Sequence, residues 1–302
     1  MRITYMQSML LAISLLALAA CNNPSPDKME NGKVAGTSAG QNGSGDSTDI
    51  TWDSTAPAGM KELRIPSTGS LLQGFIYTPN GKEPHPTLLM LHGFPGNEKN
   101  LDLAQAVRKH GWNVVYFDYR GSWGSQGSFS FRHCVEDVSN VVAFCKQHAD
   151  SLHIDTSRIA LFGHSMGGWV CLQALRRLPE LTKGFACSTW DLMPGFTKAA
   201  REGQLEKVEK DRGQYFVLNQ SGKALVEAVL QDTSYHDLSG HAAALRDKKI
   251  FMLDEHDHNR GLADSIRAYN KAGFQYEVWK TDHPFTNKRQ ALIREVIEFL
   301  DK

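Results

Sequence analysis

Residues 158–168 read RIALFGHSMGG, and this stretch indicates how the 302-residue chain folds. A short apolar run, typical of a buried strand, leads into a G-x-S-x-G motif at residues 163–167, and an apolar helical pattern follows it. The two glycines remove side chains where a tight strand-to-helix turn brings backbones together. We therefore expect Ser165 to stand in a strained, exposed conformation at a helix N-terminus, where the helix dipole favours developing negative charge.

Strand and helix signals alternate on both sides of this motif. Apolar runs that predict strands lie at residues 71–78, 87–91, 113–117, 158–162, 184–188, 249–253 and 276–280. Amphipathic patterns that predict helices lie at residues 101–110, 131–148, 165–178, 260–271 and 286–300. Such alternation indicates an α/β fold with a mostly parallel central sheet and helices on both faces.

One segment, from about residue 190 to 241, interrupts this alternation. It carries helical patterns at residues 198–212 and 222–230 without a strand signal between them. Because it follows the carboxyl end of a predicted strand, we interpret it as a small helical cap inserted over the site. An ordinary surface excursion is the plainer alternative.

The N-terminal segment has the pattern of a targeting signal. Arg2 supplies positive charge, and residues 9–20 form an apolar run that is too short to span a bilayer and ends at Cys21. This pattern resembles the bacterial lipoprotein signal peptide, so we expect residues 1–20 to be removed and Cys21 to carry the lipid. An ordinary secretory signal followed by a chance cysteine is the alternative.

A lipid on Cys21 would hold the protein in the bacterial cell envelope. Asn22 follows the cysteine and favours the outer membrane, with the domain in the periplasm or exposed. Residues 21–56 are rich in Ser, Gly and Asn and would form a flexible tether, which leaves residues 57–302 as the folded domain.

Composition narrows the classes of partner. Lys and Arg together number 33, as do Asp and Glu, so the balanced charge gives no reason to expect nucleic acid as a partner. The cysteines beyond Cys21 lack metal-ligand spacing and are expected to be buried free thiols, with a Cys171–Cys187 disulfide as the alternative; they are Cys134, Cys145, Cys171 and Cys187.

Four motifs give the chain a resemblance to the α/β-hydrolase superfamily over about residues 61–302, and most closely to its serine aminopeptidase and prolyl-oligopeptidase-like branch. They are HGFPGN at residues 92–97, DYRGSWG at 118–124, the motif at 163–167 and TDHPF at 281–285. The resemblance implies the α/β-hydrolase fold, no cofactor and no metal. It also implies a serine hydrolase that cleaves a small ester or a short peptide through an acyl-enzyme.

The resemblance also implies roles for single residues. Ser165 would be the nucleophile, and His283, after the last predicted strand, would be its base. The backbone N–H groups of Phe94 and Met166 would form the oxyanion hole. Asp257 is the favoured acid, because the order Ser165, Asp257, His283 matches the superfamily.

The identity of the acid leaves alternatives open. Relatives usually carry Gly where Asp254 stands, so Asp254 or Glu255 could be the acid, and Asp191 is a further candidate. The acidic and histidine-rich run at residues 254–258 also contains metal-ligand types, but no matching ligand set appears elsewhere in the sequence.

Two further hypotheses remain beside the triad. Arg120 and Trp123 lie in a glycine-rich loop and could contact substrate, or the loop could serve only as a turn with Trp123 packed inward. A ligand-binding lipoprotein that uses the hydrolase scaffold without catalysis is the rival to an enzyme, since a fold alone does not fix a function.

Overall fold

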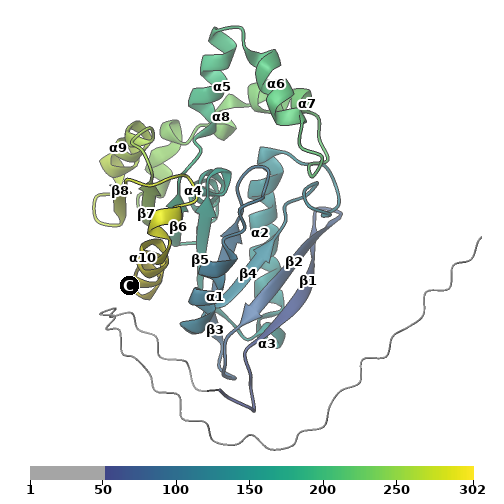
Figure 1. Cartoon of the computed structure of the whole chain (residues 1–302), viewed down its shortest axis with the longest axis vertical. Helices are drawn as coiled ribbons and strands as arrows, with labels where there is room; N and C mark the ends of the chain where they lie inside the picture. The colour runs from purple at the N-terminus through teal and green to yellow at the C-terminus, as the bar shows by residue number, and fades with distance from the viewer. Residues whose placement is uncertain (1–51) are drawn as a thin grey trace, which may run out of the picture. The chain divides into compact units, whose positions relative to one another are not determined.

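The computed structural model describes residues 52–302 (Figure 1). Within this range one sheet of eight strands has the order β1-β2-β4-β3-β5-β6-β7-β8. β2 is antiparallel to both of its neighbours, and all other neighbouring strands are parallel. The strands are β1 (Gly59–Ser67), β2 (Ser70–Thr78), β3 (His85–Leu91), β4 (Asn113–Phe117), β5 (Ile154–His164), β6 (Lys183–Cys187), β7 (Lys249–Asp254) and β8 (Phe274–Val278).

Helices cover both faces of the sheet, as the alternating pattern predicts. The helices outside the cap are α1 (Leu101–Lys109), α2 (Phe131–Gln147), α3 (Ala149–Leu152), α4 (Met166–Arg177), α9 (Arg260–Tyr269) and α10 (Arg289–Asp301), with the short 3-10 helix η2 (Thr286–Lys288) before α10. Side chains of α2, α4 and α9 belong to one hydrophobic core, and those of α1 and α10 belong to the other.

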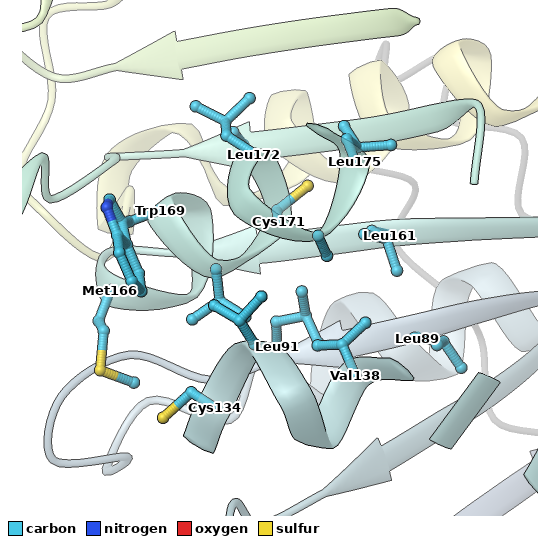
Figure 2. Close-up of a cluster of buried hydrophobic side chains, with 14 of the residues drawn as sticks. Leu89, Leu91, Cys134, Val138, Leu161, Met166, Trp169, Cys171, Leu172 and Leu175 are labelled. Atoms are coloured by element: carbon cyan, nitrogen blue, oxygen red, sulfur yellow. The ribbon is translucent and has the colours of Figure 1, made fainter. Parts of the chain in front are cut away.

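The two cores meet the sheet on opposite faces because side chains alternate along a strand. Val114 of β4 belongs to the core of α1 and α10, and its neighbour Val115 belongs to the core of α2 and α4. Figure 2 shows part of the core that contains side chains of α2, α4 and α9, with Leu91 of β3 beside Val138 of α2. The central strands are therefore buried on both faces, which explains their continuous apolar runs.

The sequence did not predict β1, and the bounds of several strands differ from the expectation. β1 lies at the edge of the sheet, and its outward residues are exposed, so the nine residues do not show a strong apolar pattern. β8 begins at Phe274, two residues before the predicted position, because Phe274 is the buried anchor of that strand while Tyr276 is only partly covered.

The segment between β6 and β7 forms five short helices, so the predicted helical insertion is present. They are α5 (Leu192–Arg201), α6 (Leu205–Gly213), α7 (Gly222–Gln231), α8 (Thr233–His236) and the 3-10 helix η1 (Ser239–Leu245). Figure 1 shows α5, α6 and α7 above one end of the sheet. We use the word cap for α5 to η1.

Backbone hydrogen bonds attach the cap to the glycine-rich loop after β4. Trp123 N–H donates to Val217 O at 3.0 Å, and Asn219 N–H donates to Gly121 O at 2.6 Å. Leu218 forms an isolated bridge with Ser122 between these two bonds. The loop therefore supports the cap through its backbone.

Several expectations concern residues before 52. The signal peptide at residues 1–20, Cys21 and all but the last residues of the tether lie outside the described residues. Within residues 52–302, no helix combines the length and the apolar character needed to cross a bilayer. The expected free thiols are confirmed, since Cys134, Cys145, Cys171 and Cys187 are all buried and unbridged.

A buried ion pair joins the loop after β4 to α2. Arg120 Nε donates to Asp137 Oδ1 at 2.6 Å, and the Arg120 backbone N–H donates to Asp137 Oδ2 at 2.8 Å. Ser67 Oγ, at the end of β1, also donates to Asp137 Oδ1 at 2.6 Å. One buried carboxylate therefore ties together an edge strand, a loop and a helix.

Replacing Asp137 with Ala should destabilise the domain by about 3–5 kcal/mol, because it removes the buried acceptor of Arg120 Nε, of the Arg120 backbone N–H and of Ser67 Oγ. Urea unfolding would measure the change in the free energy of unfolding. Glu136→Ala is the matched control: Glu136 pairs with the same guanidinium but its side chain is 40% exposed, so the loss should be about 1 kcal/mol or less. Equal losses in the two variants would contradict this account.

Candidate active site

Ser165 occupies the turn between β5 and α4 in a strained backbone conformation. Its φ of 59° and ψ of −120° confirm the geometry expected from the motif. A Cβ on Gly163 would lie 2.0 Å from Gly167 O, and a Cβ on Gly167 would lie 1.9 Å from Leu91 O. Only glycine fits at either position, so the two glycines make this turn sterically feasible.

The strand ends beside the turn hold it in place. Ser165 N–H donates to Cys187 O, at the end of β6, at 2.8 Å. Trp190 N–H, from the following loop, donates to Ser165 O at 3.0 Å. The backbone of the serine is therefore fixed from the β6 side, while its side chain borders a cavity.

Glu255 and His283 form a short ion pair next to this turn. His283 Nδ1 lies 2.7 Å from Glu255 Oε1, and Ser188 Oγ donates to Glu255 Oε2 at 2.6 Å. The carboxylate can only accept, so Nδ1 of His283 carries the proton and Nε2 is left as the basic nitrogen. The backbone carbonyl of His283 accepts from His164 Nε2 at 2.9 Å, which fixes the loop that bears the imidazole.

The pair changes the pKa of both partners. Burial alone would raise the pKa of Glu255, but the hydrogen bonds from His283 and Ser188 outweigh it and lower the pKa to about 2. The hydrogen bond with Glu255 raises the pKa of His283 above its usual value of 6.5, against the opposing effect of burial. Glu255 is therefore charged throughout the physiological range and strengthens His283 as a base.

The structure does not bring Asp257 to His283, and the sequence-based choice of acid needs correction. The Asp257 side chain is 70% exposed and lies 4.0 Å from Arg260 Nε. Asp254 is fully buried and accepts from Thr189 N–H at 3.1 Å. Because side chains alternate at the end of β7, Asp254 turns into the protein and Glu255 turns toward His283. Glu255 was one of the alternatives left open.

A cavity of about 640 Å³ joins these residues to the cap. Ser165, His283 and Glu255 line it on the side of the sheet, together with Ser188. Its remaining lining residues come from the loops after β3, β6 and β7 and from the cap; they are Phe94, Thr189, Trp190, Asp191, Pro194, Gly195, Arg212, Ser239, His256, His258, Asn259, Gly261 and Leu262. The cavity is of the size that encloses a small organic ligand.

Phe94 and Met166 both lie close to Ser165. Gly93 is so close to Ser165 that a Cβ there would stand 3.1 Å from Ser165 Cβ, which places the turn after β3 beside the serine. Met166 is the first residue of α4, so its N–H is one of the groups that a helix leaves without an internal partner. Both side chains pack inward or along the cavity wall, so only the backbones are available for the expected role.

Arg120 and Trp123 are not among the residues that line this cavity. Arg120 is buried against Asp137, and Trp123 Nε1 donates to Pro95 O at 2.7 Å. Of the two alternatives for this loop, the structure therefore favours turn formation with Trp123 packed inward over substrate contact.

The histidine-rich run does not assemble a metal site in the described part of the chain. His256 and His258 border the cavity, with ring centroids 3.7 Å apart. Within residues 52–302, no group of three or more His, Cys, Asp or Glu side chains is placed to hold a metal ion.

Asp191, the remaining candidate acid, lines the cavity, and burial together with the nearby Asp237 raises its pKa to about 6.

Ser188 and Arg212 are site residues that the sequence did not single out. Ser188 is the last residue of a predicted strand, and its φ of 47° turns the hydroxyl toward Glu255. Arg212 belongs to the charged helix α6, of which no residue is fully buried and Leu205 and Val208 are partly packed against the core. Neither residue lies in a sequence motif, so only the contacts in the folded structure identify them as site residues.

Comparison with known proteins relates the chain to hydrolases. The BD-FAE family model matches residues 75–250. A stretch of 105 residues is 32% identical to the lysophosphatidylserine lipase ABHD12 of Danio rerio and covers 34% of this chain and 26% of that protein. A stretch of 126 residues is 26% identical to cutinase 1 of Thermobifida cellulosilytica and covers 39% of this chain and 45% of that protein. The chain thus spans less than half the length of these relatives.

Solved structures confirm the expected α/β-hydrolase fold. The Pyrococcus furiosus esterase Pf2001 aligns with a TM-score of 0.58 and 17% identity, over 84% of this chain and 97% of that chain. Est1E from Butyrivibrio proteoclasticus aligns with a TM-score of 0.60 and 15% identity, over 79% of this chain and 97% of that chain. At these identities the likeness establishes the fold alone.

Replacing Glu255 with Gln should lower the pKa of His283, because the amide lacks the negative charge that favours the imidazolium. Asp257→Asn is the matched control, since it removes the same charge from the same loop without touching the pair. NMR titration of the His283 ring would measure both variants. A pKa that falls in Asp257→Asn and stays unchanged in Glu255→Gln would restore Asp257 as the partner.

Proposed function

The chain belongs to the BD-FAE family, and from that premise we propose that it is a serine hydrolase of carboxylic esters. The observation that carries the proposal is the linked set of Ser188, Glu255 and His283, which lies on the wall of the same cavity as Ser165. A deprotonatable imidazole beside a serine in a strained turn is the arrangement that activates a hydroxyl for attack on a carbonyl.

In the proposed mechanism, Ser165 Oγ attacks the ester carbonyl carbon while His283 Nε2 accepts the hydroxyl proton. The backbone N–H groups of Phe94 and Met166 donate to the oxyanion of the tetrahedral intermediate. The intermediate then collapses, and His283 gives its proton to the departing alcohol. Water, deprotonated by His283, releases the acid from the acyl-enzyme. Glu255 stabilises the imidazolium that forms in each half of the reaction.

Within residues 52–302, the hydrogen bonds of His283 go to Glu255, His164 and Ser188 and not to Ser165. A hydrogen bond between a nucleophile and its base often forms only in the complex with substrate. The imidazole is held from its far side by Glu255 and through its backbone by His164.

Ester cleavage is favoured over peptide cleavage by the names of the related proteins, which include a lipase and a cutinase. The serine aminopeptidase and prolyl-oligopeptidase-like branch, with a short peptide as substrate, stays a prediction. The rival hypothesis of a ligand-binding scaffold without catalysis has less support, because binding alone does not require Glu255 to raise the pKa of His283.

The decisive experiment is labelling of the chain by a fluorophosphonate probe, with Ser165→Ala as the control. We expect labelling of the parent and none of the variant, together with at least a thousandfold loss of activity on 4-nitrophenyl butyrate. The value of kcat/KM should rise with pH through the raised pKa of His283, because only the neutral imidazole accepts a proton. A folded parent that neither reacts with the probe nor cleaves the ester would leave the binding hypothesis in the lead.

Cys21 is the basis of a second proposal, on the location of the protein. Its support is the sequence pattern alone, and the lipid would place the ester-cleaving domain in the bacterial cell envelope. Expression in a bacterial host with labelled palmitate should give a labelled, membrane-associated chain. Cys21→Ser should abolish both the label and the membrane association, and a variant that stays labelled would exclude Cys21 as the acceptor.

A further inference from the structure

Arg212 is the cap residue that brings a positive charge to the cavity. It comes from α6, and its guanidinium carbon lies 4.6 Å from the ring centroid of Trp190 and 5.5 Å from that of Phe94. Both rings line the same cavity as Ser165. The aromatic faces hold the planar guanidinium by cation–π contact and direct it along the cavity wall.

Arg212 forms no ion pair within residues 52–302. No carboxylate lies within 4.0 Å of its guanidinium, whereas Arg120 and Arg289 have such partners, and Asp211 next to it in the chain acts on it only over a longer distance. Its Nε is buried without a hydrogen-bond partner. Burial lowers the pKa of Arg212, yet a guanidinium stays protonated at neutral pH. The Nε–H donor of Arg212 is thus left unpaired at a buried position, where an unpaired donor is unfavourable.

The position of Arg212 is close to the reacting groups without being part of them. Trp190 N–H donates to Ser165 O, and Phe94 follows the turn that borders the serine. Arg212 and Ser165 line the same cavity, so one ligand bound there can reach both residues. Asp191 also lines the cavity, and burial together with Asp237 raises its pKa. It forms no ion pair with Arg212, so the guanidinium stays available to a ligand.

We propose that Arg212 recognises an anionic group, a carboxylate or a phosphate, on the ester that this enzyme cleaves. The inference rests on the proposed esterase function and adds the class of substrate. A guanidinium presents parallel N–H donors that match a carboxylate or phosphate, and such bonds are strongest where water is excluded. The anion would pair the donors that the protein leaves open, and the two aromatic rings would fix its direction relative to the scissile bond.

Two pairs of esters test the proposal on the full chain, and each pair shares its scissile bond. In the first pair, mono-4-nitrophenyl adipate carries a carboxylate on the acyl side, and its methyl ester is neutral. In the second pair, 1-butyrylglycerol 3-phosphate carries a phosphate on the alcohol side, and 1-butyrylglycerol is neutral. The readout is the ratio of kcat/KM for the charged ester to kcat/KM for the neutral one, which distinguishes the two anions.

In Arg212→Gln, we expect this ratio to fall about tenfold or more in at least one pair, the range for a hydrogen bond to a charged group. Arg212→Lys keeps the charge without the planar fork and should give an intermediate ratio, which also serves if the Gln variant folds poorly. Lys210→Gln is the matched control, because Lys210 is an exposed residue of the same helix and loses the same charge. Both of its ratios should equal those of the parent.

The outcomes separate this inference from the function on which it rests. If the parent cleaves none of the four esters, the proposed esterase function fails and the inference fails with it. If the parent cleaves them and both ratios stay unchanged in Arg212→Gln, the esterase function stands and the inference is overturned. An equal fall of the ratio in Lys210→Gln would also overturn it, since the effect would then come from overall charge.

Discussion

The close packing around Ser165 is the constraint on which the rest of the site depends. α4 begins at the end of β5, and a Cβ on Gly167 would lie 1.9 Å from Leu91 O. This approach is open only to glycine, and it brings the end of β3 and the turn at Phe94 beside Ser165. The positive φ of Ser165 is held by backbone bonds to neighbouring strand ends, so the strain is offset by the packing of the sheet.

Adjacent parallel strands supply the remaining groups in order across the sheet. β6 ends before Ser188, β7 before Glu255 and β8 before His283. Because the carboxyl ends of parallel strands lie along one edge, residues far apart in the chain share one cavity. The hydrogen bonds from Ser188 and His283 then keep the Glu255 carboxylate charged. The cap contributes Arg212 to the same cavity.

Much of this arrangement could be predicted, and the reason is that it depends on local patterns. Apolar runs identified the central strands, and the glycines of the motif identified the turn at Ser165. The edge strand β1 gave a weak signal because half of its residues face solvent. The choice between Asp257 and Glu255 failed for a different reason, since it depends on the residue at which β7 ends and on which way its last side chain points.

The sequence by itself determined the fold class, the turn at Ser165 and the position of His283 after the last strand, because each follows from periodicity, glycine sterics or chain order. Only the tertiary structure decided that Glu255 faces His283 and that Arg212 stands unpaired against Trp190. Those relations join strands and a cap that are distant in the chain. Their physical basis is the direction of a side chain at a strand end and the contact of a cap side chain with the loop after β6, and neither leaves a pattern in the order of residues.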